Sequence, residues 1–124
     1  MSVQLNHTIV WCTDKQKSAS FLCQLLGLAA AKPFGPMLVV QLANNVSLDF
    51  YENDEISVQH YAFLLDEEEF DHVFARLQGR GLMYWADPGK QRPGEIYQHN
   101  GGRGMYFDDP DGHLLEVLTQ PYSI

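Results

Sequence analysis

The chain has 124 residues, of which 45% are apolar, and this is enough to bury the core of one domain. Its formal net charge of −8 repels phosphate backbones and therefore argues against a nucleic-acid-binding protein. The chain has neither the apolar run of about 18 residues that a membrane span needs nor an N-terminal signal pattern, so we expect a cytoplasmic protein.

The first half of the chain predicts a strand, a helix and three further strands. Residues 3–12 are rich in β-branched and aromatic side chains, which favours a strand that contains His7. Asp14 is a good N-cap for a helix over 14–26, and Gly27 supplies a left-handed stop. Turn signals separate the remaining strand candidates, which are residues 28–34, 37–42 and 46–51.

The second half repeats this order. Residues 57–65 predict a strand that contains His60. Asp66 and Glu69 then form a variant of the capping box, which indicates the start of a helix. The strand candidates that follow are residues 82–85, 105–108 and 113–119.

The repeat predicts the fold class. One sheet with one helix cannot cover both of its faces, so two copies are needed to enclose a core. We expect one α+β domain over 1–124, made of two βαβββ modules at about 1–53 and 57–124, with a curved mixed sheet around a central cup. The polar loop 87–100 is long for a small domain, and such loops are often functional lids.

Each copy offers one histidine on its first strand and one carboxylate on its last. These pairs are His7 with Asp49 and His60 with Glu116. Glu116 shares a strand face with leucines, and a carboxylate buried there needs a charge partner. A single strand histidine is more often a core or surface residue than a ligand. The matched positions in both copies are what favour a divalent-metal site, since two imidazoles and one carboxylate leave open positions on the ion.

A resemblance to a known family supports this interpretation. Residues 104–117, Gly-Met-Tyr-Phe-Asp-Asp-Pro-Asp-Gly-His-Leu-Leu-Glu-Val, resemble the ending of the glyoxalase, bleomycin-resistance and extradiol-dioxygenase proteins, the vicinal-oxygen-chelate superfamily. Residues 5–7 and 60–63 are similar to the first-strand motifs of its two modules. The resemblance covers the whole chain and implies paired βαβββ modules around a cup-shaped metal site.

The resemblance also implies roles for single residues. His7, His60 and Glu116 fall where the family places its metal ligands, and the ion would be Fe, Mn, Ni, Co or Zn. Asp49 falls where glyoxalase I enzymes carry a fourth ligand, and otherwise it would serve as a general base. Tyr106 would donate a hydrogen bond to a substrate oxygen, although an ordinary strand aromatic explains it equally well.

Two further residues are candidates for substrate binding. Arg103 would hold an anionic group near the mouth of the cup, and a surface arginine is the alternative. Trp11 shares the strand face of His7 and would wall an apolar pocket, with a core role as the alternative. Cys12 and Cys23 match no zinc motif, and we expect both to be reduced and structural.

The function implied is a metal-dependent enzyme that chelates two neighbouring oxygens of a small molecule. Lyase, isomerase, thiol-transferase and ring-cleaving dioxygenase reactions all fit, although Ile9 stands where fosfomycin-resistance transferases carry a threonine. The alternatives are a metal-free protein that binds a drug or metabolite, as bleomycin-resistance proteins do, and a protein whose metal is only structural. The resemblance further implies a homodimer.

Overall fold

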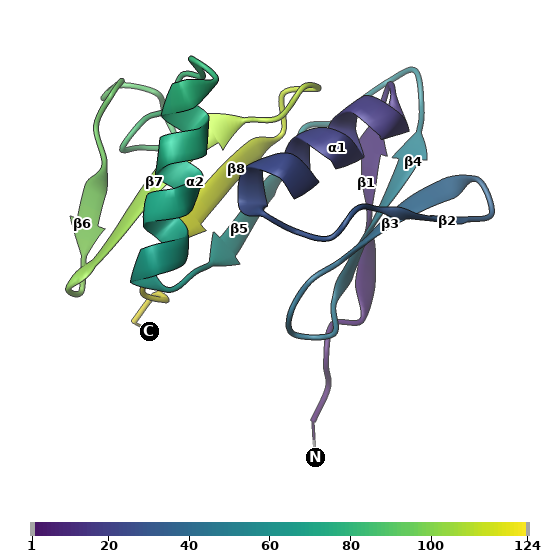
Figure 1. Cartoon of the computed structure of the whole chain (residues 1–124), viewed down its shortest axis with the longest axis horizontal. Coiled ribbons are helices and arrows are strands. Elements are labelled where there is room, and N and C mark those ends of the chain that lie inside the picture. The colour runs from purple at the N-terminus through teal and green to yellow at the C-terminus, as the bar shows by residue number, and fades with distance from the viewer. Residues whose placement is uncertain (1, 124) are drawn as a thin grey trace. The chain divides into compact units, whose positions relative to one another are not determined.

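The structure is a computed structural model that describes residues 2–123. The chain forms two compact units that divide between Ser57 and Val58, close to the predicted link between modules. Each unit is one four-stranded mixed sheet with one helix (Figure 1), as the α+β prediction required. No helix within residues 2–123 is long and apolar enough to cross a membrane.

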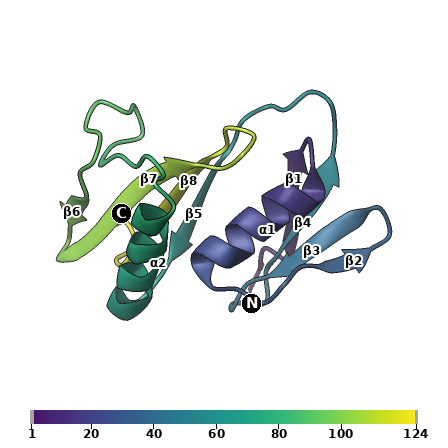
Figure 2. The ribbon, with the colours of Figure 1, turned by 45° about the horizontal axis from the view of Figure 1, so that its top comes forward.

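In the first unit, helix α1 lies on β3 and β4, on one face of the sheet (Figure 2). The strand order is β1-β4-β3-β2, with β1 and β4 parallel and the other pairs antiparallel. The elements are β1 (His7–Cys12), α1 (Lys15–Leu26), β2 (Lys32–Phe34), β3 (Met37–Gln41) and β4 (Ser47–Glu52).

The ends of α1 follow from its sequence. The Asp14 side chain accepts a hydrogen bond from the Lys17 amide at 3.1 Å, and Gly27 ends the helix at a φ of 70°. A left-handed residue of this kind costs least when it has no Cβ. Phe21, Leu22 and Leu25 are buried on the face that packs on the sheet.

The second unit repeats this arrangement with the order β5-β8-β7-β6. Strands β5 and β8 are parallel, and the other pairs are antiparallel. The elements are β5 (His60–Leu64), α2 (Glu67–Gly79), β6 (Tyr97–His99), β7 (Gly102–Asp108) and β8 (Leu114–Leu118). The predicted capping box is present, since Asp66 and Glu69 each bond the backbone amide of the other.

The strands of the second unit differ from the prediction. Residues 82–85 form no strand, and Trp85 makes only isolated bridges to Pro93 and Tyr106. In its place the structure has a strand that was not predicted, β6, which lies inside the predicted polar loop 87–100. In the first unit, the predicted strand 28–34 is confined to β2. Short strands of this kind depend on pairing with a neighbour, which no local pattern records.

Register divides the side chains of the second sheet between its two faces. Along β7, Arg103, Met105 and Phe107 point to the α2 face, and Tyr106 points to the other face. Glu116 stands directly opposite Tyr106 on β8, and therefore shares the face away from α2. His60 on β5 belongs to the same face, because it pairs with Leu114, two residues before Glu116.

Candidate functional site

Glu116 is the centre of the candidate site. Its side chain is fully buried in the middle of the sheet, between β5 and β7. Its Oε1 lies 3.1 Å from Nε2 of His60, and its Oε2 accepts a hydrogen bond from the Tyr97 hydroxyl. The buried carboxylate thus has the partners that its burial requires, and one of them is the histidine predicted as a fellow ligand.

The hydrogen bonds of His60 fit a metal ligand. Nδ1 lies 2.9 Å from the carbonyl oxygen of Leu114, which only accepts, so Nδ1 carries a proton. Nε2 is then free to present its lone pair to the lone pairs of Glu116 Oε1. Two such acceptors at this distance repel each other unless positive charge lies with them, either a second ring proton or a cation. An imidazole held through Nδ1 by a backbone carbonyl is the arrangement that metal-bound histidines usually show.

Two phenols border the pair. The Tyr106 ring centroid lies 5.8 Å from that of His60 and 5.9 Å from that of Tyr97. Burial raises the pKa of both Tyr97 and Tyr106 above its usual value, and the nearby Glu116 carboxylate adds to this effect. Both hydroxyls therefore stay protonated at neutral pH and act as hydrogen-bond donors.

The first unit holds the other predicted pair. His7 and Asp49 line a hollow of about 440 Å³, together with apolar side chains that include Met37 and Val39. His7 Nδ1 lies 2.7 Å from Oδ1 of the Asn6 side chain. With Nδ1 donating to that oxygen, Nε2 is the ring nitrogen that could bind an ion.

Asp49 and Trp11 occupy the same face of the first sheet as His7. Asp49 is buried and accepts a hydrogen bond from Ser47 Oγ at 3.0 Å. Trp11 stacks on Tyr51 with ring centroids 5.2 Å apart. This face therefore carries a carboxylate and two stacked aromatic rings, and Trp11 shares it with His7 as predicted.

The structure brings the predicted ligands together in pairs. His60 and Glu116 are in contact in the second unit, and His7 and Asp49 line one hollow in the first. Within residues 2–123, no three histidine, cysteine, aspartate or glutamate side chains form a group that could hold a metal ion. The three-ligand set of His7, His60 and Glu116 remains a prediction.

Arg103 has a different place from the one expected. Its guanidinium bonds Glu67 at 2.7 Å and Asp71 at 2.8 Å, both on α2, and lies 4.4 Å above the ring of Phe70. These contacts anchor α2 to β7, on the face opposite Glu116. The guanidinium also borders a hollow of about 560 Å³, but it is already paired with two carboxylates, so its role in holding a substrate group remains a prediction.

Tyr97 is part of this site although no sequence pattern considered above predicts it. It lies in the segment predicted as a polar loop, yet it contacts the central carboxylate. Asn100-Gly101 was the signal that could have found it, because this dipeptide is typical of a two-residue hairpin turn. A hairpin there places two short strands in register and brings Tyr97 onto the sheet.

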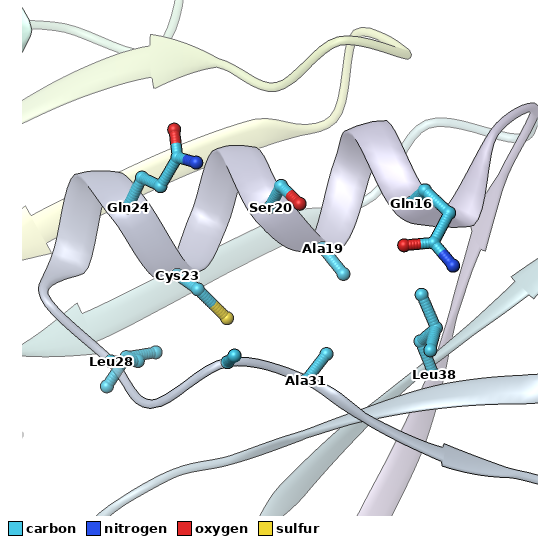
Figure 3. Close-up of a pocket in the computed structure, with 9 residues that line it drawn as sticks. Gln16, Ala19, Ser20, Cys23, Gln24, Leu28, Ala31 and Leu38 are labelled. Carbon is cyan, nitrogen blue, oxygen red and sulfur yellow. The ribbon is translucent and has the colours of Figure 1, made fainter.

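A second hollow of about 240 Å³ lies beside α1 (Figure 3). The Cys23 sulfur points toward it, among Ala19, Ala31 and Leu38. Burial raises the pKa of the Cys23 thiol, so the thiolate needed for nucleophilic chemistry is scarce at neutral pH. The hollow has no charged lining residue, and this supports a structural role for Cys23.

Comparison with known families agrees with the fold. The model of the Glyoxalase/Bleomycin resistance protein/Dioxygenase superfamily matches residues 4–117. The chain belongs to this superfamily. Among curated members, it is similar to the glutathione transferase FosA of Serratia marcescens, with 35% identity over 94% of this chain and 81% of that protein. It is also 31% identical to the metallothiol transferase FosB of Lysinibacillus sphaericus strain C3-41, over 96% of this chain and 84% of that one.

Two solved structures are also similar to this chain. Oxidase ChaP-H1 has a TM-score of 0.96 and 58% identity, over 99% of this chain and 100% of that one. The fosfomycin resistance protein FosX from Listeria monocytogenes has a TM-score of 0.73 and 22% identity, over 100% of this chain and 96% of that one. At this identity FosX supports the fold alone.

Proposed function

We propose that this chain is a divalent-metal-dependent oxidase that acts on a small molecule with two neighbouring oxygens. The observation that carries the proposal is the buried Glu116 carboxylate, whose Oε1 lies 3.1 Å from Nε2 of His60. The 58% identity with oxidase ChaP-H1 over essentially the whole chain favours oxidation over the other reactions of the superfamily.

Each residue has a part in this proposal. His60 and Glu116, with His7 as the third ligand, would hold one ion of Fe, Mn, Ni, Co or Zn. When bound, the ion would supply Lewis-acid binding of the substrate oxygens. Tyr106 would donate a hydrogen bond to one of those oxygens, and Asp49 would accept a proton from the substrate as it is oxidised. Dioxygen is the electron acceptor of an oxidase, so oxygen uptake is the direct readout.

Thiol transfer is the second candidate, because FosA and FosB relatives match more than nine-tenths of this chain. The two reactions consume different co-substrates. Oxygen uptake with catechols or hydroxyquinones would support the oxidase. Loss of glutathione in the presence of fosfomycin, without oxygen uptake, would support the transferase instead.

The first experiment is metal analysis by mass spectrometry of untagged protein. We expect about one divalent ion per chain in the wild type, and little in the Glu116→Gln and His60→Ala variants. His72→Ala is the matched control, because His72 is exposed on α2, away from this pair, and should leave metal content unchanged. If the wild type takes up no divalent ion even after incubation, a metal-free binding protein replaces the enzyme as the proposal.

We also propose that the protein is a homodimer, as the family resemblance implies, and that it is cytoplasmic. Light scattering coupled to gel filtration would give a mass twice that of the chain. A mass equal to that of one chain would contradict the proposal.

A further inference from the structure

The two oxygens of Glu116 have different partners. Oε1 lies 3.1 Å from His60 Nε2, whereas Oε2 accepts a hydrogen bond from the Tyr97 hydroxyl. The carboxylate has no exposed surface, so water does not compete for either oxygen. Oε2 is therefore occupied by the hydrogen bond from Tyr97, and Oε1 is the oxygen that a cation beside His60 can contact.

A tight turn places Tyr97 at this position. Strands β6 and β7 are joined by Asn100 and Gly101, whose φ angles are 51° and 77°. Two successive positive φ angles are the mark of the type I′ turn, which fixes the register of a hairpin. A slip of one residue would turn Tyr97 to the α2 face, away from Glu116.

Gly104 leaves the space that the Tyr97 ring occupies. It is the cross-strand partner of Tyr97, and a Cβ at this position would overlap the ring and the hydroxyl. Tyr106 packs against the ring from the neighbouring position on the same face. The missing side chain of Gly104 thus lets the phenol lie across β7 and reach the carboxylate on β8.

We infer that Tyr97 is a positioning residue of the metal site, which holds one oxygen of Glu116 so that the other oxygen is presented beside His60. This inference rests on the proposed function, because it assigns Glu116 as a metal ligand. It adds a residue in β6 and a glycine in β7 that support that ligand. Hydrogen bonds of this kind to ligating residues are commonly worth about 10- to 100-fold in metal affinity.

The test is a Co²⁺ titration of the metal-free protein, followed by visible absorption. We expect Tyr97→Phe to weaken Co²⁺ binding by about 10- to 100-fold and to shift the Co²⁺ absorption bands, since the carboxylate is no longer held. The phenyl ring and its packing remain, so the melting temperature of the metal-free protein should change little. Tyr84→Phe is the control, because Tyr84 packs on Phe74 of α2, and it should bind Co²⁺ as the wild type does.

Gly104→Ala gives an independent variant, because it displaces the ring without removing the hydroxyl. We expect weaker Co²⁺ binding here too, and a double variant with Tyr97→Phe whose loss is smaller than the sum of the two. Wild-type affinity and an unchanged spectrum in Tyr97→Phe would overturn the inference alone. A wild type that binds no Co²⁺ would overturn the proposed function, and the inference with it.

Discussion

Asp49 has two possible roles, as a fourth metal ligand or as a proton acceptor. It is buried, and its Oδ1 already accepts a hydrogen bond from Ser47. It stands where the family resemblance implies a longer glutamate ligand, and a side chain shorter by one methylene has less reach toward an ion. Proton acceptance from substrate is therefore the role that we assign to it.

We predict that Asp49→Asn retains its metal but loses about 100-fold or more in kcat, because an amide cannot accept the proton. Metal analysis and oxygen uptake on the same sample separate the two roles. A variant that loses its metal would instead identify Asp49 as the fourth ligand. Asp54→Asn, on the exposed link between the units, should behave as the wild type.

Tyr106 gives a prediction on pH dependence. Burial, and then the Glu116 carboxylate, raise the pKa of this phenol, so it remains a donor from about pH 6 to 9. We expect Tyr106→Phe to lower kcat by about 100-fold through loss of one hydrogen bond to the substrate, without changing the shape of the pH profile. A profile that loses its alkaline limb in the variant would show that Tyr106 ionises in the reaction.

At the scale of elements, helix α2 is held both at its start and along its side. The capping box satisfies amides of its first turn, and three consecutive acidic residues, Glu67, Glu68 and Glu69, complement the helix dipole. We predict that Asp66→Ala lowers the free energy of unfolding by about 1 kcal/mol, measured by urea denaturation. Glu68→Ala removes a charge from the same turn and leaves the capping box intact. It should lower the free energy of unfolding by at most a few tenths of a kcal/mol.

The side contact of α2 is Arg103. We expect Arg103→Met to lower the free energy of unfolding, measured by urea denaturation, through loss of the pairs with Glu67 and Asp71, with KM unchanged. The methionine keeps part of the contact with Phe70, which limits the loss. A raised KM at unchanged stability would restore the role in substrate binding that the sequence suggested.

At the scale of the whole molecule, metal binding and folding are linked. An ion that binds only the folded chain stabilises it by about 2.7 kcal/mol when its concentration is 100 times Kd. We therefore predict that saturating Co²⁺ raises the melting temperature of the metal-free wild type by several degrees, measured by differential scanning fluorimetry, and leaves that of Glu116→Gln unchanged. An equal rise in both proteins would mean that the ion binds elsewhere on this acidic chain.

The sequence by itself determined what depends on local patterns. The doubled order of strand, helix and strands predicted the fold, Asp14 and Asp66 marked the helix starts, and alternation along the strands predicted that the row of Glu116 is buried. Each helix or strand is recognised from residues a few positions apart, because capping and the alternation of side chains act over that short distance along the chain.

Only the tertiary structure decided how distant segments pair. It placed Tyr97 on Glu116 through the register of β6 and β7, and it turned Arg103 toward α2. Strand β6 has three residues, which is too short for a pattern of alternation, and the glycines of β7 are poor strand formers. Asn100-Gly101 marks their turn in the sequence, but the fit of the Tyr97 ring over Gly104, and so its reach to Glu116, became visible only in the folded chain.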